Sequence, residues 1–152
     1  MCIRDRLSLR GCHTLQDVDA LADLFALKRL NLDGCSSLKH LDGLANLTHV
    51  IELTLSGCKS LKDVNGIAKL IKLKELNLSN CTSLQQVDGL SNLNMLKSID
   101  LSGCSSLKDV NGLSNLVALT SVELLECTSL EHVDGLANLH NCLLYTSDAA
   151  DE

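Results

Sequence analysis

A 23-residue period runs through most of the chain. Equivalent apolar residues open successive segments, and no insertion separates one segment from the next. These residues are Leu7, Leu30, Leu53, Leu76, Ile99 and Val122. A fixed period of roughly 20–50 residues is typical of repeat architectures, in which each unit packs mainly against its neighbours. The repeat therefore predicts one continuous solenoid over residues 7–141.

The unit from residue 30 to residue 52 shows how the first half of each repeat is expected to fold. Leu30 and Leu32 alternate with polar residues, which is the pattern of a half-buried strand. Gly34 then allows a sharp turn that directs Cys35 inward. A short strand followed by a tight turn is the predicted start of every repeat.

The second half of the same unit has a different spacing. Leu44, Leu47 and Val50 recur at every third position, which suits a short 3₁₀ or α-helical segment. Asp42 precedes this segment and is predicted to cap it, because a carboxylate can accept unpaired backbone N–H groups. The few apolar side chains of one repeat cannot offset the conformational entropy of ordering it, so the repeats must stack.

Two segments carry the pattern LxxLxLxxCxxL: LKRLNLDGCSSL over residues 27–38 and LKELNLSNCTSL over residues 73–84. This pattern resembles that of leucine-rich repeat proteins, and the resemblance covers about residues 7–141. It implies an α/β solenoid, a curved array with a parallel β-sheet on its concave side and short 3₁₀ or α segments on its convex side. The phrase LKDVNGL is most similar to short-repeat bacterial and protozoan types, because plant repeats usually continue with a Leu-Pro pair and this chain has no proline.

The pattern stops abruptly at both ends. The position one period before Leu27 is Arg4, and the position one period after Leu119 is Cys142. MCIRD can be encoded ATGTGTATAAGAGAC, and the reverse complement of that DNA, read one frame over, supplies the bases for CLLYTS. We therefore interpret residues 1–6 and 142–152 as translated sequencing-adapter sequence. Residues 7–141 are then a fragment of a larger protein, with six repeats of which the last is incomplete.

Composition excludes two classes of partner. The formal net charge is −6, and the chain holds one Phe, one Tyr and no Trp. Nucleic-acid binding needs a cationic surface, and single-strand binding also needs aromatic platforms. No apolar run of about 18 residues is present, so no membrane insertion is expected within this fragment. The sequence thus favours neither nucleic acid nor a membrane.

Six of the eight cysteines occupy one position of the repeat. They are Cys12, Cys35, Cys58, Cys81, Cys104 and Cys127. Disulfides or a metal ladder are possible interpretations, but stacked side chains run parallel rather than converge, and no paired zinc spacing occurs. We predict buried thiols that bond to the backbone. Free thiols favour a reducing compartment but leave the localisation open.

A second column consists of acidic and amide residues. Its members are Asp19, Asp42, Asn65, Asp88, Asn111 and Asp134. Stacked carboxylates could ligate calcium, which takes oxygen ligands. Helix capping explains the same column without a metal, because Asn caps as well as Asp. We therefore predict a structural column, no metal and no cofactor.

A third column holds hydroxyl groups: Thr14, Ser37, Ser60, Ser83, Ser106 and Ser129. Each precedes a core leucine, which predicts turn hydrogen bonds to nearby backbone. A nucleophile would need a general base in a consistent register beside it, and the scattered histidines supply none. We therefore predict no catalytic residues and no enzymatic activity in this fragment.

The residues that flank the strand leucines are predicted to face out of the concave sheet. This predicted binding face comprises Arg29, Asn31, Asp33, Glu52, Thr54, Ser56, Glu75, Asn77, Ser79, Ser98, Asp100 and Ser102. It is polar and varies between repeats, whereas the scaffold around it does not. Its centre is acidic, which favours a basic protein partner over an acidic one.

Three functions remain open at this point. The favoured one is a protein-interaction module that uses the concave face, an inference that depends on fold resemblance. The second is a structural spacer or stalk of a surface protein. The third is the substrate-recognition part of an enzyme whose catalytic domain is missing. The oligomeric state is not indicated by the sequence.

Overall fold

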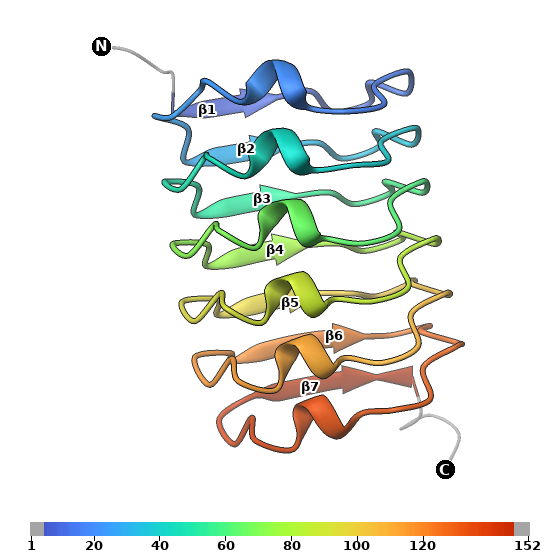
Figure 1. Ribbon diagram of the computed structural model, residues 1–152. Helices are drawn as coiled ribbons and strands as arrows, with labels where there is room; N and C mark the ends of the chain where they lie inside the picture. Colours follow the sequence, from blue (N-terminus) through green and yellow to red (C-terminus); the bar gives the residue numbers. More distant parts are fainter. Residues whose placement is uncertain (1–4, 148–152) are drawn as a thin grey trace.

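The computed structural model describes residues 5–147, and they form a solenoid in which each repeat is one rung (Figure 1). A single parallel sheet of seven strands runs through it, with the strands side by side in chain order. The strands are β1 (Arg6–Ser8), β2 (Arg29–Asn31), β3 (Glu52–Thr54), β4 (Glu75–Asn77), β5 (Ser98–Asp100), β6 (Ser121–Leu124) and β7 (Leu143–Thr146).

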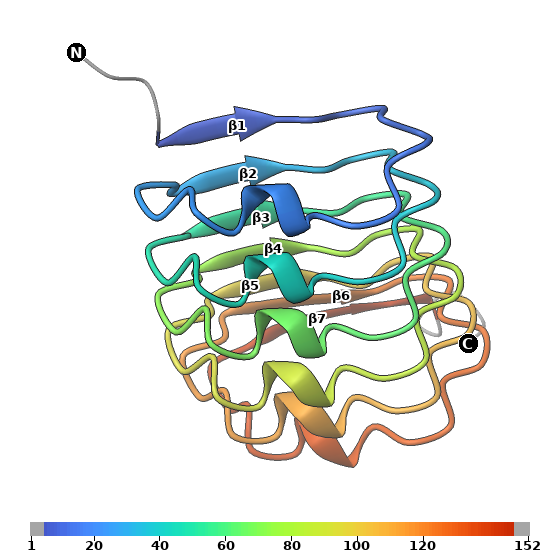
Figure 2. The same ribbon diagram turned by 45° about the horizontal axis from the view of Figure 1, so that its top comes forward.

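The opposite side of the solenoid is lined by short helices (Figure 2). All the helices of the described residues are 3₁₀ helices of three residues. They are η1 (Asp19–Leu21), η2 (Asp42–Leu44), η3 (Asn65–Ile67), η4 (Asp88–Leu90), η5 (Asn111–Leu113) and η6 (Asp134–Leu136). The predicted solenoid, with a sheet on one side and short helices on the other, is confirmed. None of these helices has the length or apolar character to cross a membrane.

The strand register follows the period of the sequence up to β6. Leu30 pairs with Leu53, and Leu53 pairs with Leu76, each exactly one repeat further along the chain. Beyond β6 the register shortens, because Val122 pairs with Leu144, which lies one position short of a full repeat. The regular period places equivalent side chains of β2 to β6 in continuous rows across the sheet.

Both segments that we interpret as adapter-derived reach into the described structure. Arg6 opens β1, and β7 lies within residues 142–152, whereas residues 1–4 and 148–152 lie outside the described residues. Leu143, Leu144 and Tyr145 are 65%, 50% and 47% exposed. Backbone pairing with the free edge of β6 needs no repeat pattern, so we still propose that both segments are extraneous to the array.

The core is a continuous aliphatic column along the whole solenoid. One row of it, Leu32, Leu55, Leu78 and Leu101, is fully buried in successive rungs. The predicted turn at Gly34 is confirmed, because its φ is +74° and Cys35 behind it is fully buried. Asn80 (φ +59°) and Glu126 (φ +58°) occupy the same position in later rungs. A left-handed conformation is common for Gly and tolerated by Asn, but it strains Glu.

The cysteine column is a ladder of free thiols that bond to the backbone, as predicted. The Sγ of Cys58 donates to the carbonyl oxygen of Leu32 in the preceding rung at 3.3 Å, and Cys81 donates to Leu55 at 3.1 Å. All seven cysteines from Cys12 to Cys142 are free. Burial raises the pKa of the Cys58 thiol to about 12. The ladder is therefore a packing element held in the protonated form.

The predicted capping role of Asp42 is wrong. Asp42 is itself the first residue of η2, and its side chain is exposed. The preceding residue, Leu41, holds the N-cap position, and no side-chain cap bond is formed there. The helix has only three residues, and it is closed by the N–H of Ala45, which donates to the carbonyl oxygen of Asp42. The same arrangement recurs in the other five helices, so the column marks helix starts without capping them.

In alternate rungs, a different carboxylate accepts the backbone N–H of the first helical residue. The N–H of Asn65 donates to Oδ1 of Asp63 at 3.0 Å, and the N–H of Asn111 donates to Oδ1 of Asp109 at 3.0 Å. The acceptor thus lies two residues before the helix, in an Asx turn. In these rungs the helix start is therefore served by Asp63 or Asp109, and not by the residue at the head of the helix.

Candidate functional site: the concave face of the sheet

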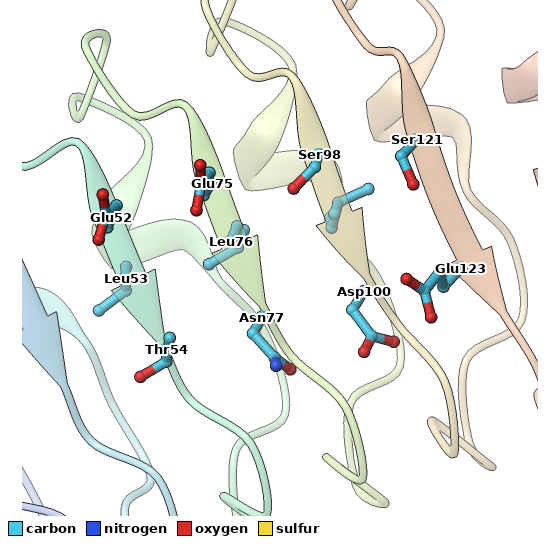
Figure 3. Close-up of a pocket in the computed structure, with 11 residues that line it drawn as sticks. Glu52, Leu53, Thr54, Glu75, Leu76, Asn77, Ser98, Asp100, Ser121 and Glu123 are labelled. Carbon is cyan, nitrogen blue, oxygen red and sulfur yellow. The ribbon is translucent and has the colours of Figure 1, made fainter. Parts of the chain in front are cut away.

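The outward side chains of the sheet form two rows over a shallow hollow of about 270 Å³. Figure 3 shows Glu52, Glu75, Ser98 and Ser121 in one row, and Thr54, Asn77, Asp100 and Glu123 in the other. Leu53, Leu76 and Ile99 form the floor between the rows. We call this surface the concave face. Ser121 and Glu123 also line it, although they were not among the predicted binding residues.

The charges on the concave face are unevenly compensated. Arg29 Nε lies 3.0 Å from Glu52 Oε1, and both side chains are only part-exposed. Within residues 5–147, no ion pair involves Glu75, Asp100 or Glu123. The negative charge therefore concentrates on β4, β5 and β6, further along the array than Glu52. We call Glu75, Asp100 and Glu123 the acidic group.

Three predicted binding residues have a structural task. The Oδ1 atoms of Asn31, Asn77 and Asp100 each accept the backbone N–H of the residue two positions later, at 2.9 Å. This bond stabilises the exit of the chain from the strand, and it leaves only part of each side chain for a ligand. Asn and Asp form such bonds readily, so their presence at this position was a usable signal.

The rung that contains β3 departs from this scheme. Thr54 occupies the position of Asn31 and Asn77, but its Oγ1 is buried without a hydrogen-bond partner. The N–H of Ser56 instead donates to Oδ1 of Asp33 in the preceding rung, at 2.9 Å. Ser56 Oγ also lies 2.8 Å from Ser79 Oγ in the following rung. Asp33, Ser56 and Ser79 thus form a polar ladder along one border of the concave face. Ser102, the next residue in that row, has a buried Oγ without a partner.

The hydroxyl column does not line this hollow. Among its members in the described residues, a side-chain hydrogen bond is found at Ser60, whose Oγ donates to the carbonyl oxygen of Ser36 at 2.7 Å; this bond joins two rungs and does not close a local turn, so turn bonds for the whole column stay a prediction. Within the described part of the chain, no three His, Cys, Asp or Glu side chains gather closely enough to hold a metal ion. The chemistry that the concave face offers is recognition by charge and hydrogen bonds.

Comparison with known proteins places this geometry in a family. The family model of the leucine-rich repeat domain of endo-β-N-acetylglucosaminidase EndoS matches residues 59–138, more than half of the chain. No curated protein sequence is significantly similar to the chain.

Several solved structures have the same fold. The leucine-rich repeat domain of the type III effector XopL is 23% identical, with a TM-score of 0.60, and the match covers 88% of this chain and 58% of that one. Internalin InlF from Listeria monocytogenes is 23% identical, with a TM-score of 0.53, over 93% of this chain and 53% of that one.

A third structure shares a further feature with this chain. The functional domain of InlJ from Listeria monocytogenes, which includes a cysteine ladder, is 20% identical, with a TM-score of 0.52. The match covers 88% of this chain and 32% of that one. The chain thus spans about a third of the InlJ structure and just over half of the InlF and XopL structures. On the strength of the family match, the chain belongs to the leucine-rich repeat domains of the EndoS type.

Proposed function

We propose that this leucine-rich repeat domain is a protein-interaction module that binds a basic partner through the acidic group of its concave face. The observation that carries the proposal is the presence of three carboxylates on three consecutive strands, β4 to β6, with no ion pair to any of them among residues 5–147. Glu52, by contrast, is already paired with Arg29. The favoured contact region is therefore the half of the face that begins at β4.

The chemistry of the partner follows from this charge. Asp100 and Glu123 pair directly across strands that lie about 4.8 Å apart, so their carboxylates repel one another until a cation lies between them, while Glu75 adds negative charge from the neighbouring row. A Lys- or Arg-rich protein segment relieves that repulsion, whereas an acidic segment adds to it. None of the residues that line the hollow is aromatic, so the hollow itself offers no aromatic hot spot. We expect modest affinity that falls as salt rises, because exposed charges are screened over about 8–10 Å at physiological ionic strength.

The test uses a fluorescent peptide of alternating Lys and Gly as the probe and the full chain as the receptor. Glu75→Lys combined with Glu123→Lys should weaken binding at least tenfold, because it reverses two of the three unpaired charges. Asp100 is left intact, since its carboxylate also accepts the Ser102 N–H. The matched controls are Lys39→Glu and Lys62→Glu on another surface of the rungs, which should leave binding no weaker.

Two outcomes would decide against the proposal. If the Glu75→Lys, Glu123→Lys variant retains its affinity for the peptide while Lys39→Glu and Lys62→Glu lower it, the binding site lies on the surface that carries the lysines. Binding that responds to neither set, or no binding at low salt, would favour a spacer in which the concave face is only solvated.

A further inference from the structure

The exposed apolar side chains of the inner rungs gather on one edge of the solenoid. This edge consists of the loops that lead from each helix to the next strand, and these loops line up on the left in Figure 1. Among residues 5–124, the large hydrophobic side chains that are exposed all lie in such loops; they are Leu24, Phe25, Ile71, Met95 and Val117. Ile71, Met95 and Val117 come from three consecutive rungs and are 55%, 45% and 70% exposed.

The fold does not require an apolar residue at the tips of these loops. In three rungs the N–H of the tip residue donates to the carbonyl oxygen two residues earlier: Ile71 to Lys69 at 2.8 Å, Asn94 to Asn92 at 2.9 Å and Val117 to Asn115 at 3.0 Å. The same backbone turn thus carries Asn in one rung and an aliphatic residue in the rungs on either side. Because Asn94 suits this exposed position, packing does not account for Ile71 and Val117.

The same loops concentrate positive charge. We call residues 68–74, 91–97 and 114–120 the basic edge, because they contain no acidic residue and four of the nine lysines of the chain: Lys69, Lys72, Lys74 and Lys97. Within residues 5–147, none of these lysines forms an ion pair. Lys74 and Lys97 lie on adjacent rungs, since the N–H of Lys97 donates to the carbonyl oxygen of Lys74 at 2.8 Å. The edge therefore presents uncompensated cations beside exposed aliphatic side chains.

We propose that the basic edge adsorbs to an anionic lipid surface. The lysines contact the phosphate-bearing head groups, and Ile71, Met95 and Val117 enter the boundary between head groups and acyl chains. A row of loop tips suits a flat surface, because several tips can touch it at once. Such adsorption needs no apolar segment long enough to cross the bilayer.

The composition of the basic edge favours lipid over an acidic protein. Protein interfaces are enriched in aromatic residues and Arg and depleted in Lys. The basic edge has Lys as its only cationic residue type and contains no aromatic residue. Lysine beside aliphatic residues is instead the composition of segments that lie on membrane surfaces.

The net charge of −6 acts mainly elsewhere on the molecule. Exposed charges are screened over about 8–10 Å at physiological ionic strength, so the charges of the contacting edge dominate. Glu75 is the carboxylate that directly follows the edge in sequence, and its side chain lines the concave hollow (Figure 3). Four lysines against this one carboxylate leave the edge cationic.

The test is co-sedimentation of the full chain with vesicles. Vesicles of phosphatidylcholine and phosphatidylglycerol in equal parts should bind the chain, and vesicles of phosphatidylcholine alone should not. Lys72→Glu combined with Lys97→Glu should lower the partition coefficient by roughly 25-fold or more, since each lysine near an anionic surface contributes roughly fivefold. Ile71→Asn combined with Val117→Asn leaves the charge unchanged and should lower it by roughly fivefold or more, because the aliphatic contact is lost.

The matched control is Lys39→Glu combined with Lys62→Glu, which changes the net charge equally but lies beside another hollow of the rungs. It should alter the partition coefficient by less than roughly twofold. Glu75→Lys combined with Glu123→Lys should not weaken vesicle binding, so the result is independent of the function proposed for the concave face. Melting curves confirm that each variant is folded.

Four results would overturn the proposal. The first is an absence of binding to the anionic vesicles at low salt. The second is an equal loss in both lysine pairs, which would indicate attraction without a defined surface. The third is unchanged binding in the Ile71→Asn, Val117→Asn variant. The fourth is binding of a peptide of alternating Glu and Leu, but not of the vesicles, which would assign the basic edge to an acidic protein.

Discussion

The carboxylate of Asp33 accepts the backbone N–H of Ser56 at 2.9 Å, although the two residues lie on neighbouring rungs. In three other rungs the equivalent N–H is accepted by an Asn or Asp two residues earlier in the same rung. Thr54 stands at that position before Ser56 and provides no such bond. Asp33 therefore compensates, across the rung boundary, for a missing local acceptor.

Asp33→Ala should lower the free energy of unfolding by about 1 kcal/mol, since it leaves a half-buried N–H without its acceptor. Thr54→Asn should restore most of that loss in the double variant, because its Oδ1 can take over as Asn31 and Asn77 do in their rungs. Urea denaturation of the two single variants and the double variant measures the coupling between the positions.

Asp42→Ala serves as the control for that cycle and tests the corrected helix start. Its carboxylate is exposed and caps nothing, so the change should stay within about 0.5 kcal/mol. If Asp42→Ala lowered the free energy of unfolding as much as Asp33→Ala does, Asp42 would cap η2 after all.

The thiol ladder predicts a loss of stability in alkali. Burial raises the pKa of Cys58 and Cys104 to about 12, above the ordinary value of 9.0. Between pH 9 and pH 12 the unfolded chain loses these protons while the folded chain keeps them, so the free energy of unfolding falls as pH rises. Each such thiol contributes a slope of up to about 1.4 kcal/mol per pH unit. Denaturation curves from pH 7 to pH 10.5 measure the slope.

Cys58→Ala should flatten that slope, and at neutral pH it should cost about 1 kcal/mol because it underfills the core. Cys2→Ala, in a segment that we interpret as adapter-derived, is the control and should change neither quantity. Reductant should leave stability unaltered, since the described cysteines are free. Paired sulfurs found by thiol counting on the folded, non-reduced protein would contradict the free-thiol ladder.

The left-handed turn position predicts a stabilising substitution. Glu126 adopts φ +58° where four other rungs have Gly. Glu126→Gly should raise the free energy of unfolding by about 1 kcal/mol, because Gly adopts this conformation without steric cost. Gly57→Ala, at φ +74°, should lower it. A lower melting temperature for Glu126→Gly would contradict this expectation. It would show that the Glu126 carboxylate stabilises the fold by more than its left-handed backbone conformation destabilises it.

Much of the fold was predictable because the repeat is regular. A constant period without insertions can place Leu30 beside Leu53 in only one register, and Cys35 inside the turn follows from Gly34. The thiol-to-carbonyl bonds follow from the same stacking. The shortened register of β7 was not predictable, because that segment carries no repeat pattern and pairs through its backbone alone.

The details of the concave face were less predictable. The rows themselves follow from strand alternation, but the bond from Ser56 to Asp33 depends on the orientation of two side chains on different rungs. The pairing of Arg29 with Glu52 likewise shifted the uncompensated charge toward Glu75 and Glu123. Sequence patterns locate such residues in a row but do not show which neighbour each one contacts.

Amide chemical-shift mapping with the alternating Lys-Gly peptide tests the role of the concave face most directly, since it reports which surface the peptide contacts. The account predicts that the largest shifts at low salt fall on β4 to β6, around Glu75, Asp100 and Glu123, and that they shrink as salt is raised. Shifts centred instead on the helices η2 to η5, or spread evenly over every rung, would contradict it.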